Sequence, residues 1–199
     1  MNGRRPPADE HAAPSAAGAT SPKRHTPTEG RTTDDYPGLP ARGGTVRRST
    51  GRVIPFDADD RALLLQGSEP DRPAWRFWFT IGGMADPGES LRQAAVRELR
   101  EEAGIALDEA DLGTACLESQ IEFEWAGRHV VQDQTFFAVR LPPGARPELD
   151  GLDAVEKETT FGWAMCSEAE LAADPASLAT PELTRYVAVA LATLRSREA

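Results

Sequence analysis

Residues 83–105 read GMADPGESLRQAAVRELREEAGI, and the interpretation of the whole chain begins with this stretch. Ser90 and Gln93 have capping-box spacing, in which each side chain accepts a hydrogen bond from the backbone N–H of the other residue. Gly104 stands where helices commonly end in a left-handed glycine. The pattern therefore predicts a helix over Ser90 to Ala103.

Three carboxylates share one face of this predicted helix. Residues of an α-helix advance by about 100° each, so Glu98, Glu101 and Glu102 fall within roughly a third of its circumference. Arg97 lies four residues before Glu101 and is close enough to pair with it. The opposite side is apolar and can pack against a sheet, with Val96, Leu99 and Ala103.

Neighbouring carboxylates repel one another, which leaves two interpretations of this face open. One is a solvated acidic surface. The other is a divalent-cation site, for which oxygen ligands favour Mg²⁺ or Mn²⁺ over zinc. The glycine-rich loop predicted over Gly82 to Gly88 favours the cation site, because glycines let backbone carbonyls approach the same ion. This loop is not a phosphate-binding P-loop, since Glu89-Ser90 follows where Lys-Ser is required.

The same stretch matches the Nudix box at every defined position. The defined residues are Gly83, then Glu89 after five residues, then, after seven more, the run Arg97-Glu98-Leu99-Arg100-Glu101-Glu102-Ala103-Gly104-Ile105. The chain therefore resembles the Nudix hydrolase superfamily. It departs from many members just before the glycine pair, where Ile81 replaces a proline.

The resemblance implies an α+β fold, namely a Nudix-type α/β/α sandwich with a mixed β-sheet. It also implies Mg²⁺-dependent hydrolysis of a diphosphate linkage in a nucleoside diphosphate joined to another group, such as a nucleoside triphosphate, a nucleotide sugar or ADP-ribose. Mn²⁺ is the alternative cofactor. Homodimers are frequent among such proteins, so the resemblance also suggests a homodimer.

The resemblance also assigns roles to the residues of the box. Glu98 and Glu102 would be the main metal ligands, with Glu101 a further ligand or the base that orients water. Arg97 would hold Glu101, Glu89 would brace the loop, and the Gly82 carbonyl would reach the metal. The implied catalytic set is Glu98, Glu101, Glu102 and Arg97, and the implied metal set is Glu98, Glu102, Glu101 and Gly82.

Other site residues stay open at this point. A further acidic ligand often comes from outside the box, and Glu156 and Glu158 are the candidates, although either could be a surface charge. His129 is expected at the surface of a hairpin turn rather than as a base. Several strand aromatics could stack on a base or belong to the core: Phe77, Trp78, Phe123, Trp125 and Trp163. No subfamily signature is found, so the substrate class is open.

Composition and charge limit the number of domains, the partners and the location that can be expected. The chain has 199 residues with a net charge of −10, which suits one folded domain and argues against a polymeric nucleic-acid partner. No apolar run approaches the ~20 residues that span a membrane. Cys116 and Cys166 have no metal-binding or redox spacing, which fits a reducing cytosol. We therefore expect a cytoplasmic protein without a membrane partner.

The chain divides into a tail and a domain. Residues 1–42 are rich in Pro, Gly, Ala and charge without apolar periodicity, which predicts a disordered tail and makes His11 and His25 poor catalytic candidates. Residues 43–199 form the predicted Nudix domain. Two alternatives to a hydrolase are a non-catalytic nucleotide-sensing regulator and a scaffold acting through the tail. The intact glutamates argue against the regulator.

Strands and helices alternate along the predicted domain. Strands are expected over Arg47–Pro55, Ala62–Gln66, Trp75–Ile81 and Thr159–Met165, with a hairpin of Ala115–Trp125 and His129–Leu141. Besides the box helix, one short helix is expected from Ser167, which has capping-box spacing with Glu170, and another opens at Thr180-Pro181.

Overall fold

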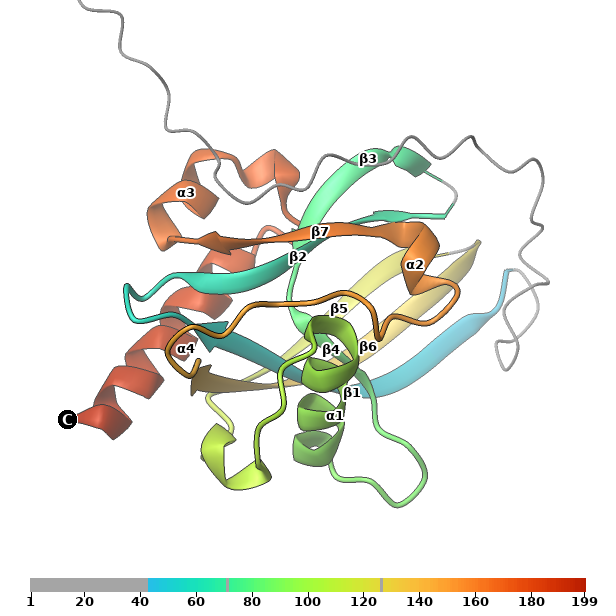
Figure 1. Ribbon diagram of the computed structural model, residues 1–199. Helices are drawn as coiled ribbons and strands as arrows, with labels where there is room; N and C mark the ends of the chain where they lie inside the picture. The colour runs from blue at the N-terminus through green and yellow to red at the C-terminus, as the bar shows by residue number, and fades with distance from the viewer. Residues whose placement is uncertain (1–42, 71, 126) are drawn as a thin grey trace, which may run out of the picture.

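The computed structural model describes residues 43–70, 72–125 and 127–199 (Figure 1). The predicted tail over residues 1–42 lies outside the described residues. The strands are β1 (Thr45–Phe56), β2 (Ala62–Glu69), β3 (Arg72–Phe79), β4 (Ile81–Met84), β5 (Leu117–Trp125), β6 (Arg128–Arg140) and β7 (Thr160–Cys166). The α-helices are α1 (Leu91–Ala103), α2 (Glu156–Thr159), α3 (Glu168–Ala173) and α4 (Leu183–Glu198), with 3₁₀ turns at Glu109–Leu112 and Pro175–Ser177.

Strand β1 lies at the centre of a mixed sheet. It pairs in parallel with β6 along its whole length, from Thr45 opposite His129 to Phe56 opposite Arg140. It pairs antiparallel with β2 and β4. The main path of the sheet is β3-β2-β1-β6-β5, with β7 joined to β2. The expected mixed sheet and the expected β5–β6 hairpin are both confirmed.

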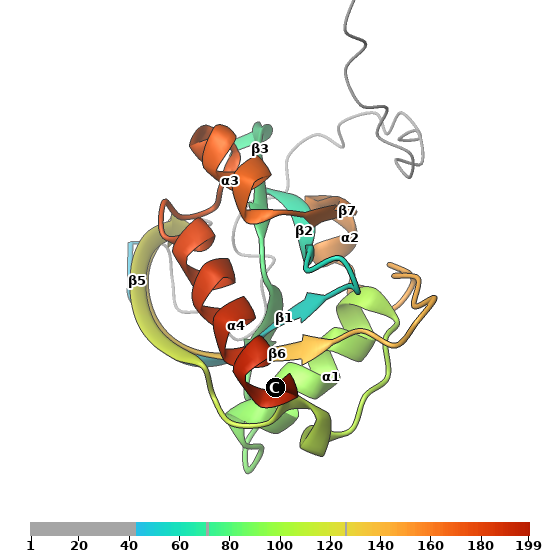
Figure 2. The same cartoon turned by 90° about the vertical axis from the view of Figure 1, so that its left-hand side faces the viewer.

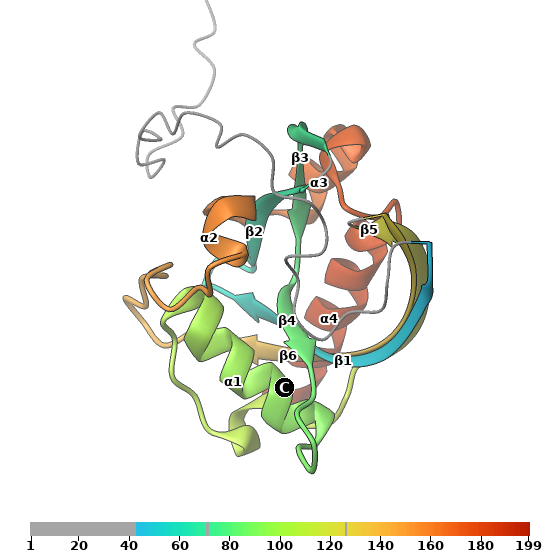
Figure 3. The ribbon, with the colours of Figure 1, turned by 90° about the vertical axis from the view of Figure 1, so that its right-hand side faces the viewer.

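Helices α1 and α4 cover opposite faces of β1 and β6 (Figures 2 and 3). Successive residues of a strand point to opposite faces, so Val53 and Phe137 join the cluster under α1, whereas Ile54 and Phe136 join the cluster under α4. The predicted sandwich is therefore present. No helix in the described part of the chain is long and apolar enough to cross a membrane.

The strand predicted over Trp75–Ile81 is in fact two strands. The break falls at Thr80, because β3 pairs with β2 whereas β4 pairs with β1. Gly82 and Gly83, which the sequence placed in a loop, belong to β4. At Gly82 φ is +132°, and a Cβ there would lie 2.3 Å from the Gly51 carbonyl oxygen, so glycine is what allows this close pairing.

The helix boundaries follow their caps. Both predicted capping boxes form, at Ser90 with Gln93 and at Ser167 with Glu170. Gly104 ends α1 in the left-handed conformation. Two expectations were wrong: the last helix begins at Leu183 rather than at Thr180-Pro181, and the short helix α2 was not foreseen.

Candidate metal centre and adjoining pocket

Helix α1 lies against β4, and this contact buries two of its carboxylates. Glu98 is 9% exposed and Glu102 is 6% exposed. The backbone N–H of Gly82 donates to Glu102 Oε2 at 2.8 Å. A Cβ at Gly83 would lie 2.2 Å from Glu98 Oε1, so the second glycine of the pair makes room for this carboxylate. The acidic face of α1 is therefore not simply a solvated surface.

A third carboxylate comes from outside the helix. One oxygen each of Glu98, Glu102 and Glu156 lies within 4.8 Å of the others. Helix α2 brings Glu156 to this place, and the Asp153 N–H donates to Glu156 Oε2 at 2.8 Å. Glu158 is not part of this group, nor is Glu101, whose side chain is 42% exposed.

Burial raises the pKa of all three grouped carboxyls. The pKa of Glu102 rises to about 8, although Arg52 and the Gly82 N–H act in the opposite direction. Burial is also the main cause for Glu98 and for Glu156. Arg97 and Arg52 offset part of the negative charge of this group, and a bound cation would offset more of it. The hard oxygen donors of these carboxylates fit a divalent ion such as Mg²⁺ or Mn²⁺, so the group could hold a divalent metal ion.

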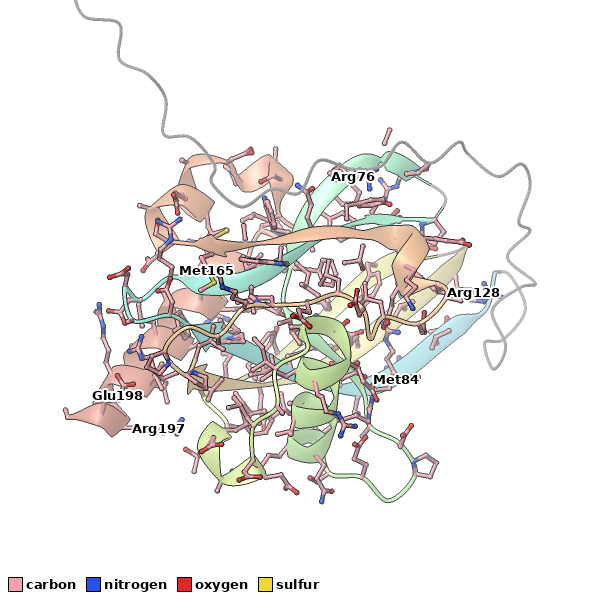
Figure 4. All side chains as sticks on the ribbon, in the orientation of Figure 1. Arg76, Met84, Arg128, Met165, Arg197 and Glu198 are labelled. Carbon is pink, nitrogen blue, oxygen red and sulfur yellow. The ribbon has the colours of Figure 1, made fainter. Side chains whose placement is uncertain are left out.

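Arg97 connects the box loop to the box helix. Its Nε donates to Glu89 Oε1 at 3.0 Å, and Nη1 donates to Glu98 at 2.9 Å and to Glu101 at 3.0 Å. Nη2 donates to the carbonyl of Met84, whose exposed side chain is labelled in Figure 4. Hydrogen bonding to Glu89 is the main reason that the pKa of Arg97 lies above its ordinary value. These contacts suit the positioning role that the resemblance gives to Arg97.

Arg52 is a residue of the site that the sequence did not single out. Its guanidinium donates to the carbonyl oxygens of Gly82 and Thr80, and its Nε donates to Thr80 Oγ1 at 3.0 Å. Burial lowers the pKa of Arg52, while the charges of Glu102 and Glu98 raise it. The Gly82 carbonyl, expected to face a metal, therefore already accepts a hydrogen bond from the protein. Only the pairing of β1 with β4 could have revealed this contact.

A pocket of about 970 Å³ adjoins the carboxylates. Arg52, Glu102 and Glu156 line it. Aromatic side chains of two strands line it as well: Trp75, Phe77 and Phe79 of β3, and Phe123 and Trp125 of β5. Of the aromatic residues considered for stacking, Trp78 and Trp163 instead pack against the two hydrophobic clusters. The pocket therefore joins an acidic end to aromatic walls.

The NUDIX domain model matches residues 46–187, which is most of the chain. This chain belongs to the NUDIX domain family. The match covers all the strands but the first residue of β1, and it contains both the box and Glu156. In this Nudix domain the box thus supplies Glu98 and Glu102, whereas Glu156 and Arg52 come from elements distant in the sequence.

Curated relatives match the Nudix domain over part of their length. An uncharacterized Nudix hydrolase, YvcI, of Bacillus subtilis is 45% identical over 60 residues, which is 30% of this chain and 34% of the relative. An RNA pyrophosphohydrolase of Erythrobacter litoralis is 35% identical over 92 residues, which is 42% of this chain and 56% of the relative. The chain spans between a third and just over half of the length of these relatives.

A solved structure shares the fold. The dihydroneopterin triphosphate pyrophosphohydrolase of E. coli superposes with a TM-score of 0.54 at 19% sequence identity. The superposition covers 74% of this chain and 99% of that one. At this identity the likeness establishes the Nudix fold alone.

Proposed function

We propose that this Nudix domain is a Mg²⁺-dependent pyrophosphohydrolase. Its substrate would be a nucleoside diphosphate joined to another group, such as a nucleoside triphosphate, a nucleotide sugar or ADP-ribose, with Mn²⁺ as a possible substitute ion. The observation that carries the proposal is the group of Glu98, Glu102 and Glu156 at the edge of a pocket of about 970 Å³. A buried cluster of this kind beside a large pocket is a typical place for metal-assisted hydrolysis.

The glutamates and Arg97 would have separate roles in metal binding, water activation and positioning. Glu98, Glu102 and Glu156 would hold the metal, which when bound neutralises the diphosphate and lowers the pKa of a water molecule. Glu101 is exposed enough to meet water, and Arg97 holds its carboxylate at 3.0 Å, which supports a role as the base or as a further ligand. Arg97 is then a positioning residue, because it acts through Glu89, Glu98 and Glu101.

Charge inside the pocket supports an anionic substrate despite the acidic chain. Arg48 and Arg52 both line the pocket. Burial is the main cause that lowers the pKa of Arg48, to about 10, so this guanidinium still carries its charge at neutral pH. A buried positive charge interacts with phosphate more strongly than an exposed one, because less water screens it. Both arginines thus place positive charge on the pocket wall, which favours an anionic ligand.

The test is hydrolysis of a substrate panel in Mg²⁺. The panel holds nucleoside triphosphates, oxidised dGTP, ADP-ribose, NADH, dinucleoside polyphosphates and nucleotide sugars. A 5′-triphosphorylated RNA oligonucleotide belongs in it too, because one relative is an RNA pyrophosphohydrolase. We expect turnover of one class that Glu102→Gln abolishes and Glu158→Gln leaves within about threefold. No turnover of any compound, with nucleotide binding intact, would instead support the nucleotide-sensing regulator.

The location, the partners and the oligomeric state of the protein remain predictions. They are a cytoplasmic location, the absence of a polymeric nucleic-acid partner and a homodimer. Sedimentation of the purified protein gives its mass, and the RNA oligonucleotide in the panel tests the second point directly.

A further inference from the structure

Gln134 of β6 carries a buried acceptor without a partner. The residue is 6% exposed, and its Oε1 accepts no hydrogen bond. Among residues 43–70, 72–125 and 127–199, Gln134 Oε1 is the one buried side-chain nitrogen or oxygen atom that has no hydrogen-bond partner. Buried polar atoms are almost always hydrogen-bonded, since an unsatisfied one costs free energy. Gln134 also lines the pocket, so a turn of its side-chain amide would let a ligand supply the missing partner.

The polar neighbours of Gln134 are already engaged. Thr50 lies opposite it on β1 and donates to the Asp133 carbonyl at 3.2 Å. Ser119 lies opposite it on β5 and is hydrogen-bonded to the Tyr186 hydroxyl at 2.6 Å. Gln132, two residues away on the same face, accepts from Arg48 Nε at 2.6 Å. The open acceptor is therefore specific to Gln134.

Gln134 lies where the base end of a nucleotide would be if the phosphates of that nucleotide were at the carboxylate group. Gln134 is in register with Thr50, and Arg52 follows two residues later on the same face of β1, roughly 7 Å along the strand. Arg52 in turn contacts Gly82, whose N–H binds Glu102. A ligand with its phosphates at the carboxylate group would thus pass Arg52 before reaching Gln134.

We propose that Gln134 reads the nucleobase of the substrate, and that the base is of the adenine type. Oε1 would accept a hydrogen bond from the exocyclic amino group, and the amide N–H would donate to the adjacent ring nitrogen, the pairing that glutamine makes with adenine N6 and N7. Aromatic side chains in the pocket walls offer faces for the flat base. This inference rests on the proposed function, because it assigns the base end of the same site.

The experiment compares two ligands that differ only in the amino group. ADP and purine riboside 5′-diphosphate are titrated calorimetrically in Mg²⁺ into Glu102→Gln protein, which blocks turnover. We expect ADP to bind at least tenfold more tightly, because the ligand without the amino group leaves Oε1 unpaired. Adding Gln134→Met should bring the two dissociation constants within about threefold of each other. Adding Gln66→Met instead, which removes an amide on β2 outside the pocket lining, should keep the difference.

The outcomes separate this inference from the proposed function. Equal binding of the two ligands to protein that retains Gln134 overturns the inference without any variant at that position. The absence of ADP binding to wild-type protein, which keeps Glu102, overturns it as well. A preference that survives Gln134→Met also overturns it, and means that another group of the protein recognises the amino group. If wild-type protein hydrolyses no nucleotide but the Gln134-dependent preference is present, the proposed hydrolysis fails and the base-reading role stands.

Discussion

Glu156 and Glu158 are two residues apart, yet they differ in their relation to the carboxylate group. Glu156 lies within 4.8 Å of Glu98 and Glu102, whereas Glu158 is outside that group. The raised pKa of Glu156 has burial as its main cause, and Asp153 and Glu101 add repulsion. A position this close to other carboxylates is favourable mainly when a cation is bound.

The first prediction concerns this pair of glutamates. Glu156→Gln should weaken Mg²⁺ binding about tenfold or more, because it removes a charged oxygen ligand and keeps the size of the side chain. Glu158→Gln removes the same charge nearby and is the matched control. Isothermal titration of Mg²⁺ into each variant measures the effect. Equal weakening by both changes would show that only overall charge matters and that Glu156 is not a ligand.

The second prediction concerns the two thiols. Burial raises the pKa of both Cys116 and Cys166 to about 11. The thiolate is the reactive form, so at pH 8 each thiol should be alkylated at least about 100-fold more slowly than free cysteine, whose pKa is about 8.5. The rate should rise about tenfold per pH unit towards pH 11, because the thiolate fraction does. Mass spectrometry after iodoacetamide treatment measures it, and rapid labelling at pH 8 would contradict the burial of these thiols.

At the scale of elements, the contact between β1 and α1 sets the position of the box helix. Gly51 lies in β1 directly under the first turn of α1. A Cβ there would come 1.8 Å from the Leu91 carbonyl oxygen and 3.0 Å from the Ala95 nitrogen. These are backbone atoms, so a larger residue would have to push the whole helix away from the sheet.

The third prediction follows from this contact. Gly51→Ala should lower the free energy of unfolding by about 3 kcal/mol or more, because neither backbone can move independently. It should also weaken Mg²⁺ binding, since α1 carries Glu98 and Glu102. Gly162→Ala in β7 is the control, because nothing lies within 4 Å of its added Cβ. Urea denaturation of both variants gives the comparison, and equal stability would mean that α1 packs less closely than described.

For the molecule as a whole, the carboxylate group joins parts of the chain that are far apart in sequence. Glu98 and Glu102 come from α1, and Glu156 comes from α2 more than fifty residues later. Repulsion among them opposes folding in the absence of a cation. A cation bound between them would therefore connect the two helices and stabilise the native state.

The fourth prediction is that Mg²⁺ raises the thermal stability. At a concentration 100 times its dissociation constant, an ion that binds only the folded protein adds about 2.7 kcal/mol, which corresponds to roughly 5–10 °C in Tm for a chain of this size. Differential scanning fluorimetry with Mg²⁺ and with EDTA measures the shift. Glu102→Gln should shrink it. An unchanged Tm across a wide range of Mg²⁺ concentration would argue against a metal site in the carboxylate group.

The sequence by itself determined the local features of this protein. Capping boxes at Ser90 and Ser167, the left-handed Gly104 and the box pattern depend on hydrogen bonds and periodicity within a few residues, so they can be read in order along the chain. The same local patterns located the hairpin of β5 and β6. The boundary of the last helix was misplaced, because its N-cap is Glu182, whose side chain makes no capping hydrogen bond that the sequence could have revealed.

Only the tertiary structure decided which distant residues share the site. Arg52 reaches Gly82 because β1 pairs with β4, and Gln134 faces the pocket because β6 pairs in parallel with β1, more than eighty residues away in sequence. Glu156 was one of two candidates until α2 brought it to the carboxylate group. Strand pairing and helix packing act between residues that no local pattern connects, so these three positions could be assigned only once the chain was folded.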